Sequence, residues 1–292
     1  MVSERTTVTF EAIKQRVRSV AEVAAWPQML QLMERAMHRD LISVWDHPSA
    51  ACRAVGGDAE AALPGAAAIF CSLIGIHLVD DMLDNDPKGD YHLMGTGKVA
   101  NLALAFQAAG HLLLHGADAS PRVRAELQAS FARMSIGTSY GQDLDTRDLR
   151  TEDEYWQTVK AKTPPLFGAA FRIGALLGGA TEPVADGLEV VGGLLGCFTQ
   201  VSDDLSDSLH SPASADWLRR GNNLPILYAM TAEHPARETF LELSARADNP
   251  EALAEAQKIL LKSGAVSYCT FKMMEIAQEA RTVLSRLPLR DP

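Results

Sequence analysis

The sequence predicts an all-α protein, and three observations carry this prediction. Apolar residues recur at helical spacing along most of the 292 residues, and no stretch shows a convincing strand-like alternation of apolar and polar residues. Two long apolar runs, within 66–86 and 187–207, end in the same pattern of aspartates, Asp-Asp-x-x-Asp. Because 47% of the residues are hydrophobic, the chain can bury a large core, and we expect one domain over residues 1–292.

The first part of the chain is predicted to be helical scaffold. Apolar residues follow helical spacing over 10–45, and Pro27 marks a break between two helices. Residues 46–57 begin as a loop and continue into a further helix. Pro64 then opens the helix that carries the first aspartates, since proline is well tolerated in the first turn.

The first aspartate pattern closes the helix within 66–86. Residues four apart lie on one face of a helix, so Asp80 and Asp84 point the same way, with Asp81 beside them. Several carboxylates at close range repel one another unless they share a cation. Nothing nearby is basic enough to neutralise them, and the pattern therefore predicts a hard divalent metal.

The middle of the chain alternates helices with irregular stretches. Residues 87–97 contain proline and several glycines and are predicted as a loop that could close over a ligand. Residues 98–114 and 121–145 are predicted helices, and the second ends in GQDLD, where Gln142 and Asp145 can share a face. Buried polar groups there would need a partner.

A proline pair interrupts the next predicted helix, over residues 152–179. Pro164 and Pro165 should kink it, because each lacks an amide donor and clashes with the preceding turn. The expected kink falls beside Lys162 and Thr163.

The second aspartate pattern, Asp203, Asp204 and Asp207, closes the apolar run within 187–207. A single acidic cluster of this kind is most often a solvated helix end. Two identical clusters on equally apolar helices favour a metal site instead. From Glu251 onward the chain is predicted to be helical almost to its end.

Composition excludes several classes of function. The chain has 27 basic and 37 acidic residues, a net charge of −10, which argues against nucleic acid as the main partner. Four cysteines lie far apart without a C-x-x-C pair, which indicates buried free thiols and a reducing cytoplasm. The first residues show no apolar signal core, and Ser72 and His77 interrupt the longest apolar run, so we expect no stable membrane insertion.

Two acidic helix ends can bind several hard cations. Mg²⁺ prefers octahedral coordination by a few carboxylates, water and substrate phosphate, so a diphosphate is the natural ligand. A diphosphate held by metal ions and basic side chains is a good leaving group, and apolar helix walls could hold a hydrocarbon chain below it.

Four segments, in order, resemble one family. ALPGAAAIFCSLIGIHLVDDMLD is similar to the first Asp-rich region of the trans-isoprenyl diphosphate synthases, GQDLD to a following helix, KTPPLF to their Lys-Thr element, and FTQVSDDLSD to their second Asp-rich region. The resemblance covers nearly the whole chain. It implies an isoprenoid-synthase-type helical bundle with a central apolar cavity, and a homodimeric, Mg²⁺-dependent prenyltransferase acting on a prenyl diphosphate.

The resemblance also implies roles for individual residues. Asp80 and Asp84 would ligate two of three Mg²⁺ ions and Asp203 the third. Lys162 would contact the allylic diphosphate, with Thr163 and Gln200 lining the reacting end. Three further residues would bind metal waters or brace the site: Asp81, Asp204 and Asp207. The polar end of the substrate would be contacted by Gln142, Arg219, Arg220 and Lys88. The wall for the prenyl chain would be lined by Ile76 and Leu73.

The wall beneath Asp80 predicts the length of that chain. Ile76 and Leu73 occupy the same helix face one and two turns back, and no bulky side chain lies immediately under the metals. We therefore expect an allylic diphosphate of about three or four isoprene units.

Departures from the family pattern concern the second substrate, isopentenyl diphosphate. The family's Gly-Gly-Lys-Arg element is replaced by LISVWDHPSAACRAVGG, its Arg-Arg pair after the first box by PKGDYH, and its late Gly-Lys by Gly221-Asn222. We expect poor use of isopentenyl diphosphate and either transfer to a different acceptor or cyclisation. An ordinary elongating synthase stays open if other basic residues substitute, and the candidates are Arg39, Arg53, Lys88 and Lys98.

Rival interpretations fit less well. A di-iron carboxylate bundle needs Glu-x-x-His pairs, and the chain has none. A terpene cyclase acting on a C15 or C20 prenyl diphosphate is the main alternative, although its second metal box wants a late acid where this chain has Ser211. A non-catalytic partner subunit usually lacks some of the aspartates, and both boxes here are intact. We expect His77 to pack above the metals, and the tryptophans to be core or interface residues.

Overall fold

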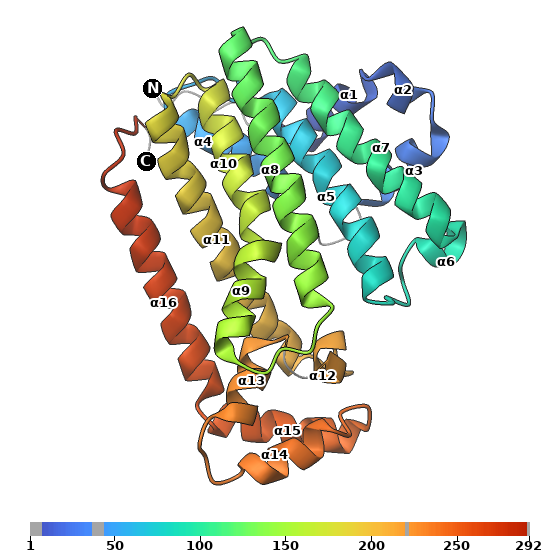
Figure 1. Cartoon of the computed structure of the whole chain (residues 1–292), viewed down its shortest axis with the longest axis vertical. Coiled ribbons are helices and arrows are strands. Elements are labelled where there is room, and N and C mark those ends of the chain that lie inside the picture. Colours follow the sequence, from blue (N-terminus) through green and yellow to red (C-terminus); the bar gives the residue numbers. More distant parts are fainter. Residues whose placement is uncertain (1–7, 37–43, 220–221, 291–292) are drawn as a thin grey trace. The chain divides into compact units, whose positions relative to one another are not determined.

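The computed structural model describes residues 8–36, 44–219 and 222–290, and within these ranges it contains helices and no strand (Figure 1). The all-α prediction is confirmed. The α helices, with short 3₁₀ turns at Val44–Asp46 (η1) and Ala59–Ala62 (η2), are α1 (Phe10–Arg18), α2 (Ala21–Ala24), α3 (Pro27–Ala36), α4 (His47–Ala54), α5 (Leu63–Leu83), α6 (Tyr91–Met94), α7 (Thr96–His115), α8 (Pro121–Asp145), α9 (Glu152–Lys162), α10 (Pro164–Leu177), α11 (Glu182–Leu209), α12 (Ala215–Arg219), α13 (Leu224–Thr231), α14 (Arg237–Ser244), α15 (Pro250–Lys262) and α16 (Ala265–Leu284).

Contacts divide the chain into two compact units. Unit 1 comprises Met1–Ser139, Pro165–Gly193 and Val283–Pro292, and unit 2 comprises Tyr140–Pro164 and Leu194–Thr282. Both units are discontinuous in sequence, and the helices α8 and α11 contribute residues to each. The single domain expected over residues 1–292 stays a prediction.

Helix α5 is the core helix of unit 1. Its residues are buried on every side from Gly65 to Gly75, as expected of a helix that is apolar all round. Helix α7 packs closely along it, because Gly75 lacks a Cβ atom that would lie 3.2 Å from the carbonyl oxygen of Ala103. Helix α8 packs on α7 through the ring of Phe131, which occupies the space left by Gly110.

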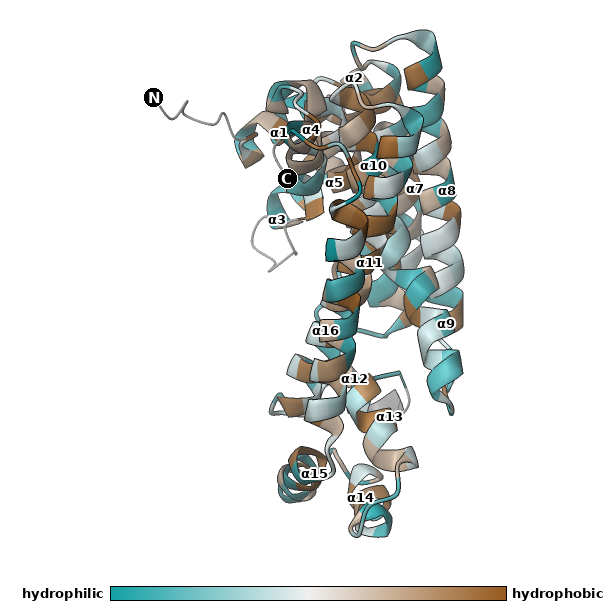
Figure 2. Cartoon of the chain, turned by 90° about the vertical axis from the view of Figure 1, so that its left-hand side faces the viewer, coloured by the Kyte–Doolittle hydropathy of each residue, from teal (hydrophilic) through white to brown (hydrophobic). Residues whose placement is uncertain are grey.

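Helix α10 packs between α8 and α11 within unit 1. A Cβ atom on Gly192 would lie 2.5 Å from the carbonyl oxygen of Phe167, and one on Gly137 would lie 3.2 Å from Pro165. These glycines therefore permit close helix packing. Figure 2 shows α10 and the adjoining part of α11 largely in the hydrophobic colour, consistent with a buried interface.

The proline pair breaks the chain into two helices where the sequence predicts one kinked helix. Helix α9 ends at Lys162 with Thr163 as its C-cap, and α10 begins at Pro164. A proline in the first turn costs little, because its missing N–H would have no intrahelical acceptor there. The predicted loop 87–97 also differs, since it contains the short helix α6.

Among the residues that the structure describes, two segments are long and apolar enough to cross a membrane by length and composition. Within the structure, 72% of the apolar window in Ala59–Leu83 is buried, and 39% of that in Glu182–Leu209. Core helices of soluble proteins pass the same test, so the expected lack of membrane insertion stays a prediction.

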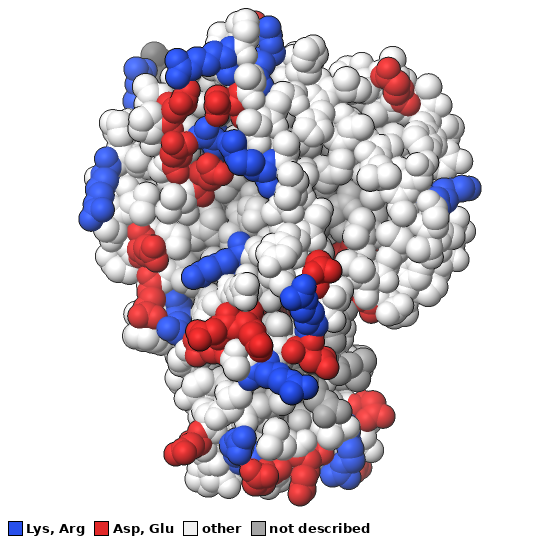
Figure 3. All heavy atoms as spheres, in the orientation of Figure 1, with Lys and Arg blue, Asp and Glu red and all other residues white. Residues whose placement is uncertain are grey.

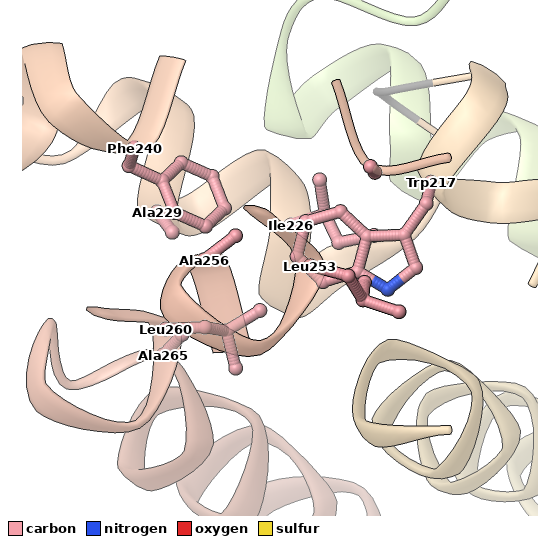
Figure 4. Packing of buried hydrophobic residues seen from close by; sticks show 9 residues of the cluster. Trp217, Ile226, Ala229, Phe240, Leu253, Ala256, Leu260 and Ala265 are labelled. Carbon is pink, nitrogen blue, oxygen red and sulfur yellow. The ribbon is translucent and has the colours of Figure 1, made fainter. Parts of the chain in front are cut away.

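Two hydrophobic clusters lie among the described residues of unit 2. In the first, Trp217 and Phe240 pack over small and aliphatic residues of α13, α15 and α16 (Figure 4). The second surrounds Tyr155 and includes Cys197 and Cys269. All four cysteines are buried and unpaired, as the sequence predicts. Burial raises the pKa of the Cys269 thiol to about 12, so this thiol stays protonated at neutral pH.

Candidate functional site

The first aspartate box lies in unit 1, at the C-terminal end of α5. Helix α5 ends at Leu83, and Asp84 is its C-cap, whose backbone N–H donates to the carbonyl oxygen of Asp80 at 2.8 Å. One carboxylate oxygen of Asp80 and one of Asp84 lie within 4.8 Å of each other. The structure thus places the two side chains together, as the helical spacing predicts. The negative end of the helix dipole at this position also favours a cation.

A tight turn follows the first box. Asn85 has a positive φ of 53°, and the N–H of Asp86 donates to the carbonyl oxygen of Asp81 at 2.9 Å. The Asp86 carboxylate accepts a hydrogen bond from the backbone N–H of Lys88 at 2.7 Å. The side chain of Lys88 is exposed, so the structure places this predicted substrate-binding residue at the surface of the turn.

An ion pair that the sequence analysis did not find lies next to this box. Arg35 of α3 pairs with Asp90, a buried residue at the start of α6. These two residues and His77 line a cavity of about 20 Å³, room for one water molecule. Sequence separation hides this contact, since α3 and the loop after the first box are 55 residues apart.

The predicted wall of the prenyl chain lies on α5. Leu73 is buried and Ile76 is half-buried, while His77 lies in the turn before Asp80 and Asp81. Their spacing agrees with the predicted common face beneath Asp80.

The second aspartate box lies in unit 2, within α11 rather than at its end. Asp203 and Asp207 are exposed at the surface, yet partial desolvation by the surrounding protein, followed by the charge of Asp207, raises the pKa of Asp203 to about 6. Partial desolvation also raises the pKa of Asp207. Carboxylates that are costly to ionise alone become charged readily when a cation is bound.

Asp204 is a fully buried member of the second box, with 2% of its surface exposed. Its Oδ2 accepts hydrogen bonds from the Tyr155 hydroxyl at 2.6 Å and the Leu224 N–H at 2.9 Å, and its Oδ1 accepts one from Gln200 Nε2 at 3.0 Å. Burial raises the pKa of Asp204 to about 7. Asp204 thus braces α9, α11 and α13 against one another, and its part in metal binding stays a prediction.

Lys162, Thr163 and Gln200 come together in unit 2. The Thr163 hydroxyl donates to Gln200 Oε1 at 2.8 Å, which orients Gln200 so that its amide nitrogen reaches Asp204. Lys162 Nζ pairs with Asp145 Oδ2 at 2.6 Å. The Lys162 side chain is thus half-buried and ion-paired. Gly141 makes the approach possible, because a Cβ there would lie 2.3 Å from Lys162 Cα.

The remaining predicted site residues differ in burial, and some lie outside the described residues. Gln142 is buried in α8. Arg53 is half-buried, and its Nη1 has no hydrogen-bond partner among the described residues. Lys98 is exposed at the start of α7. Arg39 and Arg220 fall outside the described residues, as does the side chain of Arg219.

Aromatic contacts fill the stretch in which the sequence lacks the family's Gly-Gly-Lys-Arg element. Val44 is buried, and Trp45 packs edge-on against Phe10, with ring centroids 5.5 Å apart. The His47 ring lies 5.3 Å from that of Phe167, and burial lowers its pKa to about 4, so it is neutral near pH 7. The described part of this stretch therefore offers apolar surface, a neutral ring and the single cation of Arg53 in place of a basic pair.

Comparison with known proteins gives a consistent result. Residues 76–263 match the family model for polyprenyl synthetase. A geranylgeranyl diphosphate synthase of Methanosarcina mazei is 43% identical over 82 residues, 28% of this chain and 25% of that protein. A geranylfarnesyl diphosphate synthase of Aeropyrum pernix is 28% identical over 261 residues, 82% of this chain and 81% of that protein.

Solved structures share the fold. A polyprenyl synthetase from Streptomyces coelicolor superposes with a TM-score of 0.79 at 21% identity, over 96% of this chain and 91% of that one. A geranylgeranyl pyrophosphate synthetase from Pyrococcus horikoshii gives 0.81 at 20% identity, over 95% and 90%. The predicted isoprenoid-synthase-type fold is confirmed.

Proposed function

Because the chain belongs to the polyprenyl synthetase family, whose named relatives are prenyltransferases, we propose that it ionises an allylic prenyl diphosphate with Mg²⁺ and transfers the prenyl group to an acceptor. The observation that carries this proposal is the hydrogen-bonded set of unit 2. It connects Thr163, through Gln200, to Asp204 on the helix of the second aspartate box, and beside it Lys162 pairs with Asp145 at the end of α8. A solvated acidic helix end would not need such support.

The donor atoms of both boxes suit Mg²⁺. Carboxylate oxygens are its preferred protein ligands, and one or two carboxylates usually suffice, with water and substrate phosphate completing the octahedron. We assign Asp80 and Asp84 to two ions and Asp203 to a third. Bound Mg²⁺ would offset the charge of the diphosphate and make it a better leaving group.

The chain's own side chains bind and orient the substrate. Lys162 contributes a cation for the diphosphate, and Thr163 holds Gln200 at the reacting end. Leu73 and Ile76 line the wall for a hydrocarbon of about three or four isoprene units, since no bulky side chain lies on that face immediately under Asp80. The carbocation left by ionisation is stabilised by the diphosphate and by nearby helix carbonyl dipoles.

The acceptor is proposed to differ from isopentenyl diphosphate. Holding a second diphosphate needs several charge-assisted contacts, each worth about 1.5–3 kcal/mol. The described part of the corresponding stretch instead packs Val44 and Trp45 into apolar contacts. Loss of two such contacts lowers affinity by orders of magnitude, at about tenfold per 1.4 kcal/mol. The cyclase alternative is less favoured, because the relatives are named diphosphate synthases.

Product analysis tests this proposal. Purified protein with Mg²⁺ is incubated with allylic diphosphates of increasing length, with and without isopentenyl diphosphate, and diphosphate release and products are followed. We expect release from the longer allylic substrates that depends on Mg²⁺ and little on isopentenyl diphosphate. A low micromolar KM for isopentenyl diphosphate with a single linear elongation product would show the acceptor proposal to be wrong. Absence of diphosphate release from every substrate would reject the transferase proposal itself.

We further propose a cytoplasmic homodimer that pairs through an exposed face of α7 and α8. Leu104, Ala108 and Leu112 form an exposed apolar stripe on α7, and Ile136 is 72% exposed on α8. Figure 3 shows few charges on the face over α7. The partner is a second copy, since a long uncharged helix face suits a self-complementary interface. Light scattering should show that Leu104→Glu yields monomers and that Leu261→Glu, on α15, does not. A monomeric wild-type protein would contradict this.

A further inference from the structure

Asn222 joins two parts of unit 2 that are distant in sequence, the segment before α13 and residues 145–149. Its Nδ2 donates to the backbone carbonyl oxygen of Asp145 at 2.6 Å and to Asp145 Oδ1 at 3.1 Å. Its Oδ1 accepts a hydrogen bond from the backbone N–H of Leu149 at 3.3 Å. Only 9% of the surface of Asn222 is exposed. Both ends of its side-chain amide form hydrogen bonds, to the last turn of α8 and to the segment after it.

The two oxygens of the Asp145 carboxylate have separate partners. Oδ1 faces Asn222, and Oδ2 accepts from Lys162 Nζ. The Asn222 amide hydrogen-bonds to both the carboxylate and the backbone carbonyl oxygen of Asp145. The Asp145 carboxylate therefore has little rotational freedom. The position of the Lys162 ammonium follows from that of Oδ2, because the 2.6 Å contact is at the short end of charge-assisted hydrogen bonds.

We propose that Asn222 is a positioning residue that holds Asp145 so that Lys162 presents its ammonium group to the allylic diphosphate. The inference rests on the proposed function, in which Lys162 binds that diphosphate. Lysine loses considerable rotamer freedom when it binds an anion, and prior ordering by Asp145 removes part of this cost. The family's sequence pattern has a lysine after the late glycine. At that position this chain has Asn222, which holds Asp145 without adding a charge.

A double-mutant cycle tests the coupling. Dissociation constants of an unreactive thiolo analogue of an allylic diphosphate are measured with Mg²⁺ for wild type, Asn222→Ala, Lys162→Ala and the double variant. We expect Asn222→Ala to weaken binding about tenfold when Lys162 is present, and to change it little in the Lys162→Ala background. In turnover assays KM should rise with little change in kcat.

Two further variants keep the outcome decisive. Asn222→Ser retains a polar group that is too short to reach Asp145 and should act like Asn222→Ala, even where the alanine variant is too unstable to assay. Asn249→Ala removes a different asparagine of unit 2, the N-cap of α15, and should cost stability without changing affinity. Equal effects of Asn222→Ala in both backgrounds, or no effect, would overturn the positioning role. No effect of Lys162→Ala would instead reject the proposed role of Lys162.

Discussion

The two aspartate boxes have the same sequence pattern, but their structural surroundings differ. The first stands at a helix end, where Asp84 caps α5. The second lies inside α11, which continues past Asp207 to Leu209. All three aspartates of the first box are half-buried, whereas in the second box Asp203 and Asp207 are exposed and only Asp204 is buried. The same spacing therefore serves two different environments.

The middle aspartate shows the difference most clearly. In the second box Asp204 is buried and accepts hydrogen bonds from three elements. In the first box Asp81 is only half-buried, and its backbone carbonyl oxygen accepts the hydrogen bond that forms the turn to Asp86. Spacing determines which face a carboxylate occupies, but tertiary packing determines whether it faces solvent or the core.

The largest expected effect falls on what the boxes share. Asp80→Ala and Asp203→Ala should each lower turnover of an allylic diphosphate by roughly a thousandfold, because each removes a proposed metal ligand that stabilises developing charge. Both should keep the helical circular-dichroism spectrum of wild type, since neither side chain is in the core. Rapid-quench assays measure the effect. If Asp203→Ala keeps most of its activity, the second box lacks the proposed role.

The next effect separates the boxes. Asp204→Ala should lower the free energy of unfolding by about 3 kcal/mol, because it leaves buried donors of Tyr155, Gln200 and Leu224 without an acceptor. Asp81→Ala, its matched control in the first box, should cost less than about 1 kcal/mol. Urea unfolding of both variants decides between them. Equal losses would mean that the two middle aspartates are equivalent.

Sequence periodicity predicted what depends on local geometry. It located the helices, placed Asp80 and Asp84 on one face, and marked Lys162 and Thr163 beside a proline interruption. It took Pro164 for a kink because helical pattern on both sides of a proline does not distinguish a bent helix from two helices.

Contacts between distant segments could not be predicted in this way. Tyr155 and Asp204 are 49 residues apart, and Asn222 and Asp145 are 77 apart. Which polar residues meet depends on how helices pack, which side-chain spacing along one helix does not specify. Nor does a sequence show that Gly141 lets α8 approach Lys162.

The next prediction concerns the pH dependence of stability and one carboxylate near the second box, that of Asp216. Asp216 of α12 is half-buried, and desolvation by burial, opposed by a hydrogen bond from Asn223 and reinforced by repulsion from Asp207 and Asp145, raises its pKa to about 6. The unfolded chain has the ordinary pKa of 3.8. The folded state thus binds more protons, so this group favours folding below pH 3.8, and that contribution is lost as pH rises through 6.

Asp216→Asn removes this titration while its amide oxygen can still accept from Asn223. In metal-free buffer the variant should match wild type near pH 4 and be more stable by about 2 kcal/mol at pH 7. Thermal or urea unfolding across this range measures the difference. A constant difference between the two proteins at every pH would show that Asp216 is ionised as easily in the folded chain as in the unfolded one.

The smallest expected effect isolates one hydroxyl group. Tyr155→Phe keeps the ring in its cluster, where it packs edge-on against Trp156 with centroids 5.2 Å apart, and removes only the donor to Asp204 Oδ2. The Leu224 N–H still reaches that oxygen, so the carboxylate keeps a partner and the cost should be about 1 kcal/mol. Tyr140→Phe, at an exposed position of α8, should cost less than about 0.5 kcal/mol. Asp204 adjoins Asp203, so looser bracing should also weaken metal binding. With Mn²⁺ as a spectroscopic substitute for Mg²⁺, we expect affinity to fall by roughly threefold. This corresponds to less than half of the free energy of one hydrogen bond to a charged group. Reduced stability with unchanged Mn²⁺ affinity would confine Asp204 to packing and leave Asp203 without its proposed support. The first box belongs to unit 1 and should bind Mn²⁺ equally in both proteins.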